Sequence, residues 1–247
     1  AQLFAQYEAK EKAATAKAKW IFWGILAVGI LVAAVLKEFL VGVIIVIAAF
    51  IVKKIMEAPA KKQIREACDS EAAQVAKDHD VFGCDYVGLG AYGFKEEKGE
   101  SLEGFVNIYT PVAKALKEGG KYFMYHNHAH EFKRADGKLI LSQIAERMPA
   151  ELMGFTVDTY WVQVGGGDPA QWIERLSGRV PCIHLKDCAY GQQMAVVGEG
   201  NINFDRVFEK AEAAGTKYML VEQDDCYEDP FVCMKKSYDY LRARGLY

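Results

Sequence analysis

From residue 84 onward, short apolar segments alternate with amphipathic ones, and this alternation most constrains the fold. Strands are expected where β-branched and aromatic residues gather between turn residues. These are residues 84–89, 122–128, 154–162, 181–186 and 217–222. Helices are expected over 104–117, 139–147, 169–176, 204–214 and 230–244. Strands that alternate with helices predict βα units and a parallel sheet of about five strands in an α/β fold.

The first sixty residues have a different composition. No charge occurs from Trp20 to Leu36; Lys37 and Glu38 interrupt, and Phe39–Val52 is apolar again. A spanning helix needs roughly 20 apolar residues, and few helices of water-soluble proteins are apolar on every face. We therefore expect residues 20–52 to associate with a membrane, with a buried helical pair as the alternative.

Two arrangements of this apolar segment remain open: a short hairpin, or one tilted helix with the remainder at the interface. Lysines flank the segment on both sides, which favours a hairpin with both ends in the cytoplasm. The α/β part would then be cytoplasmic and membrane-associated, or simply cytoplasmic if the segment is not native to the gene. Residues 58–62 resemble a linker, so the expected domains are 1–62 and 63–247.

Charge and cysteine content narrow the functional class. The formal net charge is −3, and nucleic-acid binding usually leaves a basic footprint, so no nucleic-acid partner is expected. The six cysteines form no C-x-x-C pair, which favours a reducing compartment. Residues 88–93 fit G-x-G-x-x-G, but no clear helix follows, so the pattern predicts a βα loop and no dinucleotide cofactor.

Three of the five histidines lie between residues 126 and 130. Alternate side chains share one face of a strand, so His126 and His128 are expected to point the same way. Imidazole is the commonest metal ligand in proteins and transfers protons near neutral pH. The octet 125–132 alone fits a metal site and a histidine-bearing loop equally well.

Other polar residues end the later strands. Asp158 ends 155–158, His184 lies near the end of 181–186, and Glu222 ends 218–222. A charge that closes an apolar strand is costly unless it is paired or bound, and the carboxyl ends of parallel strands meet at one edge. Mixed carboxylate and imidazole ligands suit a divalent metal such as Mn, Mg, Co or Zn.

These segments resemble the sugar phosphate isomerase/epimerase family, the xylose isomerase-like TIM barrels. The resemblance covers about residues 66–247 and rests on motifs in the family's order. They are Tyr125-His126-Asn127-His128 with Glu131-Phe132, Asp158-Thr159-Tyr160-Trp161, His184-Leu185-Lys186-Asp187, Val197-Gly198-Glu199-Gly200-Asn201 and Val221-Glu222-Gln223-Asp224. The resemblance implies a divalent metal and proton abstraction next to a carbonyl of a sugar, sugar phosphate or cyclitol.

The same resemblance assigns roles to single residues. It implies Glu131, Asp158, His184 and Glu222 as metal ligands, with His126 as the alternative to Glu131 at the first position. It implies Glu222 as a catalytic base that can double as ligand, and His126, His128 and Lys186 as catalytic or substrate-contacting residues. For Lys186 a surface ion pair with Asp187 is the alternative.

The family's first three βα units have no counterpart in the sequence, so the expected fold is a partial TIM-type barrel. Either another chain, for example a second copy, completes it, or the activity is impaired. Two other functions stay open: a membrane-tethered sugar-binding module without turnover, and a metal-dependent hydrolase or lyase on the same scaffold.

Overall fold

The computed structural model describes residues 13–28, 39–94 and 101–246. The chain divides into two compact units, residues 1–71 and 72–247. The boundary lies inside one continuous helix, α2 (Phe39–Asp80). The domain boundary expected at residue 62 stays a prediction, because the fold offers no break there.

In the first unit, residues 13–28 are helical and lie against the beginning of α2. The ring of Phe22 meets the ring of Phe50 edge-on, with centroids 4.9 Å apart. The linker expected over 58–62 is wrong, because α2 runs through Pro59 without interruption. The residues on either side of this proline are mostly Ala, Lys and Glu, which favour helix strongly enough to continue it.

The transmembrane segment expected over 20–52 is not supported. Among the described residues, no helix combines the length and the apolar content needed to cross a membrane. The apolar part of α2 ends at Val52, where Lys53 and Lys54 follow, and it is shorter than the roughly 20 residues that a span requires. Residues 29–38, with Lys37 and Glu38, lie outside the described part.

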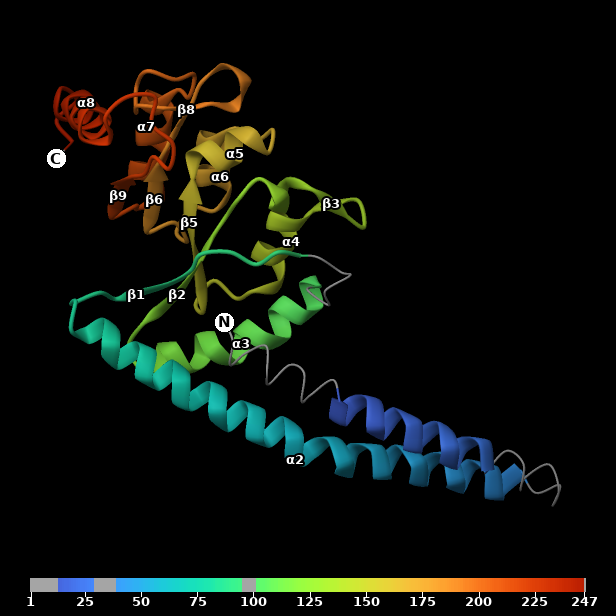
Figure 1. Cartoon of the computed structure of the whole chain (residues 1–247). Helices are drawn as coiled ribbons and strands as arrows, with labels where there is room; N and C mark the ends of the chain where they lie inside the picture. Colours follow the sequence, from blue (N-terminus) through green and yellow to red (C-terminus); the bar gives the residue numbers. More distant parts are fainter. Residues whose placement is uncertain (1–12, 29–38, 95–100, 247) are drawn as a thin grey trace. The chain divides into compact units, whose positions relative to one another are not determined.

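The second unit is built on a parallel sheet, as the alternating pattern predicted. Its strands pair in the order β1-β2-β5-β6-β9 and every pair is parallel. Figure 1 shows the strands in this order. Their bounds are β1 Tyr86–Leu89, β2 Tyr122–His126, β5 Met153–Asp158, β6 Cys182–Leu185 and β9 Tyr218–Val221. The fold is therefore an α/β half-barrel of parallel strands.

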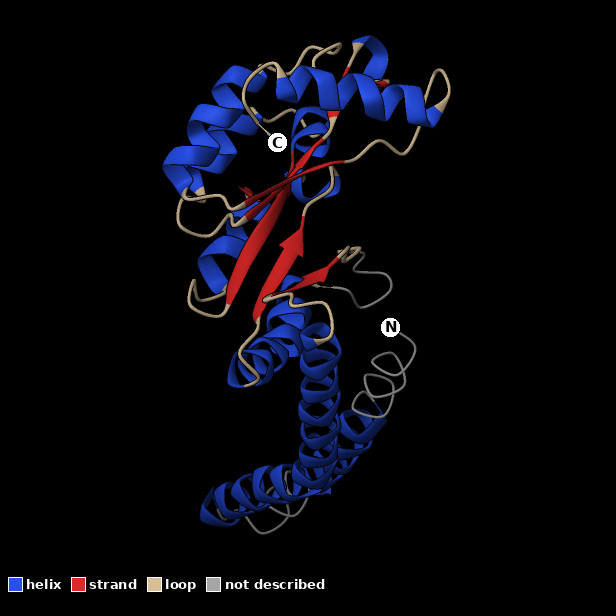
Figure 2. Ribbon diagram, turned by 90° about the vertical axis from the view of Figure 1, so that its left-hand side faces the viewer, coloured by secondary structure: helices blue, strands red, loops and turns tan. Residues whose placement is uncertain are grey.

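Helices connect the strands, and their ends follow local sequence signals. Asp168 and Asp229 cap α6 and α8 with a proline at the first position, and Gly215 closes α7 with φ +76°, as expected. Ser101 caps α3 by accepting a hydrogen bond from Gly104 N. The helices are α3 Leu102–Glu118, α4 Ile140–Arg147, α5 Thr159–Val164, α6 Pro169–Arg175, α7 Phe204–Ala214 and α8 Pro230–Arg242. Figure 2 shows these helices beside the strands.

The structure contains elements that the sequence pattern did not predict. The strand expected to continue to residue 162 ends at Asp158, where α5 begins. Two short antiparallel pairs stand apart from the main sheet, and two 3-10 turns accompany them. They are β3 Arg134–Ala135 with β4 Lys138–Leu139, β7 Asp187–Cys188 with β8 Met194–Ala195, η2 His130–Phe132 and η3 Tyr190–Gln192.

The two faces of β2 show how the sheet separates its core from its site. Phe123 and Tyr125 are buried and pack on α3, where Tyr109 stacks on Phe123 at 5.5 Å and Phe105 meets Tyr125 at 5.3 Å. Full burial of one such aromatic side chain contributes about 1.5–3 kcal/mol. The strand period turns His126 to the opposite face, which is the concave face of the half-barrel.

This curvature brings the two edge strands close to each other. Tyr86 begins β1 and Tyr218 begins β9, and their ring centroids are 6.0 Å apart. The strands lie at opposite ends of the sheet order, so a flat sheet would keep these rings far apart. The sheet is therefore rolled as in a barrel, although the described residues supply five of the eight strands that a closed TIM barrel has.

A candidate metal centre at the strand ends

The polar residues predicted at strand ends gather at the carboxyl edge of the sheet. His126 and Asp158 are the last residues of β2 and β5, and Asp158 lies opposite His184 of β6 in the pairing register. Glu222 follows the last residue of β9. Because parallel strands share one direction, their carboxyl ends meet, and four strands bring four potential ligands to one place.

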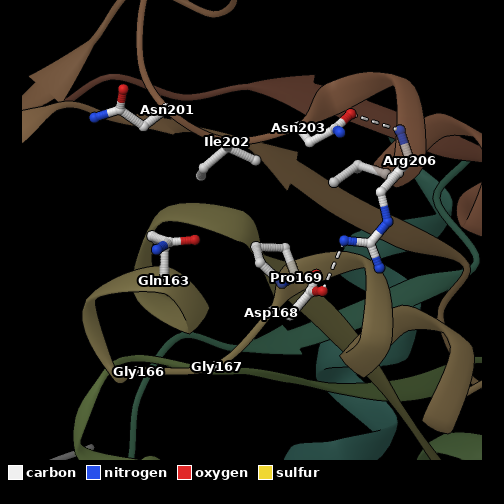
Figure 3. Close-up of a pocket in the computed structure, with 10 residues that line it drawn as sticks. Gln163, Gly166, Gly167, Asp168, Pro169, Asn201, Ile202, Asn203 and Arg206 are labelled. Atoms are coloured by element: carbon white, nitrogen blue, oxygen red, sulfur yellow. Dashed lines mark hydrogen bonds and ion pairs between the residues drawn. The ribbon is translucent and has the colours of Figure 1, made fainter.

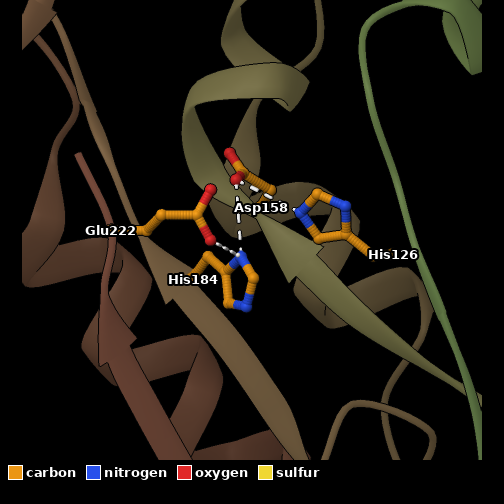
Figure 4. Close-up of side chains that lie close together, drawn as sticks. All are labelled: His126, Asp158, His184 and Glu222. Carbon is orange, nitrogen blue, oxygen red and sulfur yellow. Dashed lines mark hydrogen bonds and ion pairs between the residues drawn. The ribbon is translucent and has the colours of Figure 1, made fainter. Parts of the chain in front are cut away.

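Four side chains form a group that can hold a metal ion. The ligand atoms of His126, Asp158, His184 and Glu222 all lie within 4.8 Å of one another. Figure 4 shows the four side chains pointing toward a common centre. Asp158 Oδ2 is 3.4 Å from His126 Nε2 and 3.7 Å from His184 Nδ1, and His184 Nδ1 is 2.6 Å from Glu222 Oε2.

The backbone orients the imidazole of His126. Its Nδ1 lies 3.0 Å from the carbonyl oxygen of Gly90, directly after β1. A carbonyl oxygen only accepts, so Nδ1 carries the proton and donates it there. In the neutral ring the lone pair is then on Nε2, which faces Asp158. Metal-bound histidines in proteins are oriented in this way by a partner on the other nitrogen.

Asp158 is the most buried member of the group, with no exposed surface. Burial alone would raise its pKa, but the adjacent imidazoles of His126 and His184 and the hydrogen bond from the Trp161 N–H outweigh it and lower the pKa. One oxygen, Oδ1, caps α5 through Trp161 N, and the other, Oδ2, faces the two histidines. Asp158 is therefore a fixed, charged carboxylate with one oxygen available to a cation.

His184 provides a test of whether the group suits a metal. Its buried Nδ1 makes no hydrogen bond of acceptable geometry, although Glu222 Oε2 lies only 2.6 Å away. The imidazole nitrogen and the carboxylate oxygen are close together but not hydrogen-bonded. Both atoms can therefore act as ligands of one metal ion. Two imidazoles and two carboxylates suit Mn, Co or Zn, so the residues present fit a divalent metal.

Lys186 lies beside this group and not at the surface. Its side chain is fully buried, and Nζ contacts Glu222 Oε1 at 2.9 Å and Asp224 Oδ2 at 2.5 Å. Burial would lower its pKa, but Asp224 and Glu222 outweigh this and raise it. The surface ion pair with Asp187, considered as an alternative, is absent from the described ion pairs. The lysine therefore holds a positive charge against the carboxylates of the site.

Glu131 is not among the four grouped residues. It is fully buried, and its carboxylate accepts hydrogen bonds from the Tyr125 hydroxyl and from His128 N at 2.9 Å. His130 Nε2 lies 3.3 Å from the same carboxylate. These contacts tie the turn after β2 together. His126, the alternative first ligand, occupies the place that was expected for Glu131.

His128 lies next to the group without belonging to it. Its ring centroid is 4.7 Å from that of His126 and 5.2 Å from that of Trp161. Burial, followed by neighbouring His126 and His130, lowers its pKa to about 4. Its buried Nδ1 has no hydrogen-bond partner among the described residues. At neutral pH the side chain is an uncharged imidazole with one free polar atom.

Asp187 organises the loop before α7, a role that sequence reasoning missed. Its carboxylate accepts from four backbone N–H groups, those of Cys188, Gly198, Gly200 and Ile202, at 2.8–3.2 Å. A Cβ on Gly200 would lie 2.3 Å from Asp187 Oδ1, so only glycine fits there. The Gly-Glu-Gly motif beside an aspartate after β6 was the signal for this arrangement.

A separate cavity of about 380 Å³ lies near the beginnings of α6 and α7 (Figure 3). Gln163, Asp168, Asn201, Asn203 and Arg206 line it with neighbouring residues, and none belongs to the four-residue group. Its charges neutralise each other, because Arg206 Nη1 lies 2.9 Å from Asp168 Oδ2. The candidate site is placed at the strand ends because the ligand-type atoms converge there.

Comparison with known proteins decides the family. The family model of the xylose isomerase-like TIM barrel matches residues 43–244. The chain belongs to this family. The match begins before residue 66, where the sequence resemblance was expected to start, and it confirms that resemblance. A search of curated proteins found no match.

Solved structures share the fold of this xylose isomerase-like chain. A sugar phosphate isomerase/epimerase from Parabacteroides distasonis ATCC 8503 has a TM-score of 0.64 and 22% identity, over 77% of this chain and 76% of that one. A second one from the same organism has a TM-score of 0.57 and 24% identity, over 73% and 65%. A D-allulose 3-epimerase from Methylomonas sp. has a TM-score of 0.51 and 14% identity, over 75% and 71%. At these identities the likeness concerns the fold.

Proposed function

We propose that the chain is a divalent-metal-dependent isomerase or epimerase that acts on a sugar, sugar phosphate or cyclitol. The observation that supports this most is the convergence of His126, Asp158, His184 and Glu222 at the strand ends. Membership in the xylose isomerase-like family and the fold shared with sugar phosphate isomerase/epimerases favour the same reaction class. The reaction would move a proton on a carbon next to a carbonyl.

In this proposal His126 Nε2, His184 Nδ1 and the carboxylates of Asp158 and Glu222 hold the metal. When bound, the metal would supply Lewis-acid polarisation of the substrate carbonyl. Gly90 keeps the His126 ring in the required tautomer. The alternative first ligand, Glu131, instead fixes the turn that carries His128.

Glu222 is the proposed base. Lys186 Nζ donates a hydrogen bond to its Oε1 at 2.9 Å, which orients that carboxylate. Glu222 is one-third exposed, so a substrate carbon can reach it from the concave face. A carboxylate held by a lysine on one oxygen can remove and return a proton without moving.

Lys186 and His128 are the proposed substrate contacts. Lys186 is charged and buried, so it can bind a substrate oxygen on which negative charge develops. His128 is neutral, and its free Nδ1 can bond a hydroxyl group. The ring of Trp161, 5.2 Å from His128, gives this side of the site an apolar wall.

Two measurements test the proposal on the full chain. Metal content after loading with Mn²⁺, Co²⁺ or Zn²⁺ is compared between wild type, D158N and H184N; Asn keeps the cap on α5. The matched control is D136N, which changes an exposed carboxylate whose φ of +50° asparagine tolerates. Metal lost in the two site variants and kept in the control supports the site, and equal metal content in all four contradicts it.

Solvent deuterium incorporation tests the chemistry. Ketoses, sugar phosphates and inosose-like cyclitols are incubated with the metal-loaded chain in deuterium oxide, and the products are separated into isomers and fragments. Deuterium next to the carbonyl in the wild type, and its loss in E222Q loaded to the same metal content, supports the isomerase. Cleavage products would indicate a hydrolase or lyase, and metal binding without turnover would indicate a binding module.

A further inference from the structure

The helical residues 13–28 turn an apolar stripe outward. Trp20 is 80% exposed, Trp23 54% and Val28 61%. The exposed positions between residues 20 and 28 are Trp20, Trp23, Gly24, Ala27 and Val28, with no polar side chain among them. Outward positions of a helix in water are normally polar. This stripe is therefore expected to contact an apolar partner.

The first part of α2 repeats this arrangement. Ile47, Phe50 and Ile51 are each more than half exposed, and the ring of Phe50 also packs against Phe22 of the preceding helix. Two neighbouring helices thus present large apolar side chains outward. Apolar side chains exposed together on neighbouring helices are typical of contact sites for proteins or membranes.

Lysines border the apolar surface at one end. Lys17 and Lys19 are exposed and directly precede Trp20, and Lys53 and Lys54 follow Ile51 and Val52. The two helices run in opposite directions (Figure 1), and Lys53 Nζ lies 5.8 Å above the ring of Phe22. The lysines of both helices are therefore at the same end of the pair, next to the tryptophan that borders the apolar stripe.

We infer that this apolar surface docks on a lipid bilayer that contains anionic headgroups. Apolar side chains would enter the acyl region, Trp20 and Trp23 would lie at the boundary, where tryptophan is enriched, and the lysines would meet the headgroups. Binding of a second copy of the chain would need only the apolar residues and would not account for the lysines. The lysines at the Trp20 end of the helix pair add positive charge that complements anionic headgroups, which favours the lipid.

Vesicle flotation of the full chain tests the inference. Vesicles of phosphatidylcholine with phosphatidylglycerol should bind the chain at least tenfold more strongly than phosphatidylcholine alone, and high salt should weaken this preference. K17E/K19E should lose the preference. The matched control K114E/K117E makes the same charge change at exposed positions of α3 and should keep it.

The apolar contribution is tested in parallel. W20D/W23D should lose binding to both vesicles by at least tenfold, whereas Y190D/F231D, which alters residues 93% and 86% exposed in the second unit, should keep it. Circular dichroism confirms that the variants retain their helix content. Vesicle binding that is absent in wild type, or a lipid-free dimer that W20D/W23D dissociates, overturns the inference. Metal content is measured in the same samples, so failure here is distinct from failure of the metal site.

Discussion

The Nδ1 of His126 lies 3.0 Å from the carbonyl oxygen of Gly90, so β1 sets the direction in which the ring of β2 presents its second nitrogen. This contact favours His126 over Glu131 as the first ligand. His126 offers a lone pair to the group, whereas Glu131 uses its carboxylate on Tyr125 and His128.

We therefore expect H126A to lower metal affinity by at least about tenfold, the lower end of losses seen when the partners of metal ligands are removed. E131Q should keep the affinity within about threefold, a difference of less than 1 kcal/mol. Isothermal titration calorimetry with Mn²⁺ or Zn²⁺ measures both. A larger loss in E131Q than in H126A would return the first position to Glu131.

Removal of the Lys186 charge should destabilise the site. Lys186 is fully buried, while Glu222 is 33% and Asp224 56% exposed, so water compensates part of the loss. We expect K186M to lower the free energy of unfolding by about 1–3 kcal/mol, less than for a fully buried pair. Adding D224N should restore part of this, because one unpaired charge is removed.

Urea denaturation of the wild type, both single variants and the double variant forms a cycle that isolates this interaction. Turnover in K186M should fall more than metal content does, because in the proposed function the lysine contacts both the substrate and the base. Strict additivity of the two substitutions would show that Lys186 and Asp224 do not interact.

His128 makes stability depend on pH. Its pKa of about 4 in the folded chain is below the ordinary 6.5, so the folded state favours the neutral ring. The resulting stability is present above about pH 6.5 and is lost as the pH falls toward 4. H128Q cannot titrate, so its free energy of unfolding should decline less over this interval. Urea denaturation in EDTA at several pH values measures it, and parallel curves for both proteins would contradict it.

Asp187 should hold the backbone of the loop before α7 in one conformation. D187N replaces an oxygen that accepts backbone N–H groups by an amide that cannot accept them. We expect a loss of about 2–4 kcal/mol in the free energy of unfolding, from two charge-assisted hydrogen bonds at about 1.5–3 kcal/mol each with partial compensation by water. Amide exchange of Gly198, Gly200 and Ile202 should accelerate more than that of β2. Unchanged exchange in the loop would refute this role.

The strand-end residues were predictable because each closes an apolar strand with a charge. Asp158, His184 and Glu222 stand out in the sequence for this reason, and the parallel topology fixes where they meet. The choice between His126 and Glu131 was not predictable, because both follow β2 and their partners Gly90 and Tyr125 are revealed only by the fold.

The other elements that the sequence did not predict have local causes. Residues 155–162 form one apolar run, so the change from strand to helix at Asp158 leaves no break in hydropathy; the cap on Trp161 N is the only signal. The hairpin of β7 and β8 is too short for a strand period to show. Pro59 suggested a break, but its helix-forming neighbours carry α2 through it.

The contact between Tyr86 and Tyr218 shows that the five-stranded sheet is already rolled. The candidate metal centre therefore assembles without a closed barrel. Gly90, His126, Asp158, His184 and Glu222 come from, or directly follow, the five strands present, and the rolled sheet holds them at one edge. Tyr218 and Leu220 remain about half exposed on β9, on the same face as Glu222 by the strand period. In the proposed function, a further strand laid along β9 would narrow the concave face and exclude water from it without adding a ligand, so substrate selectivity and metal affinity would be separable.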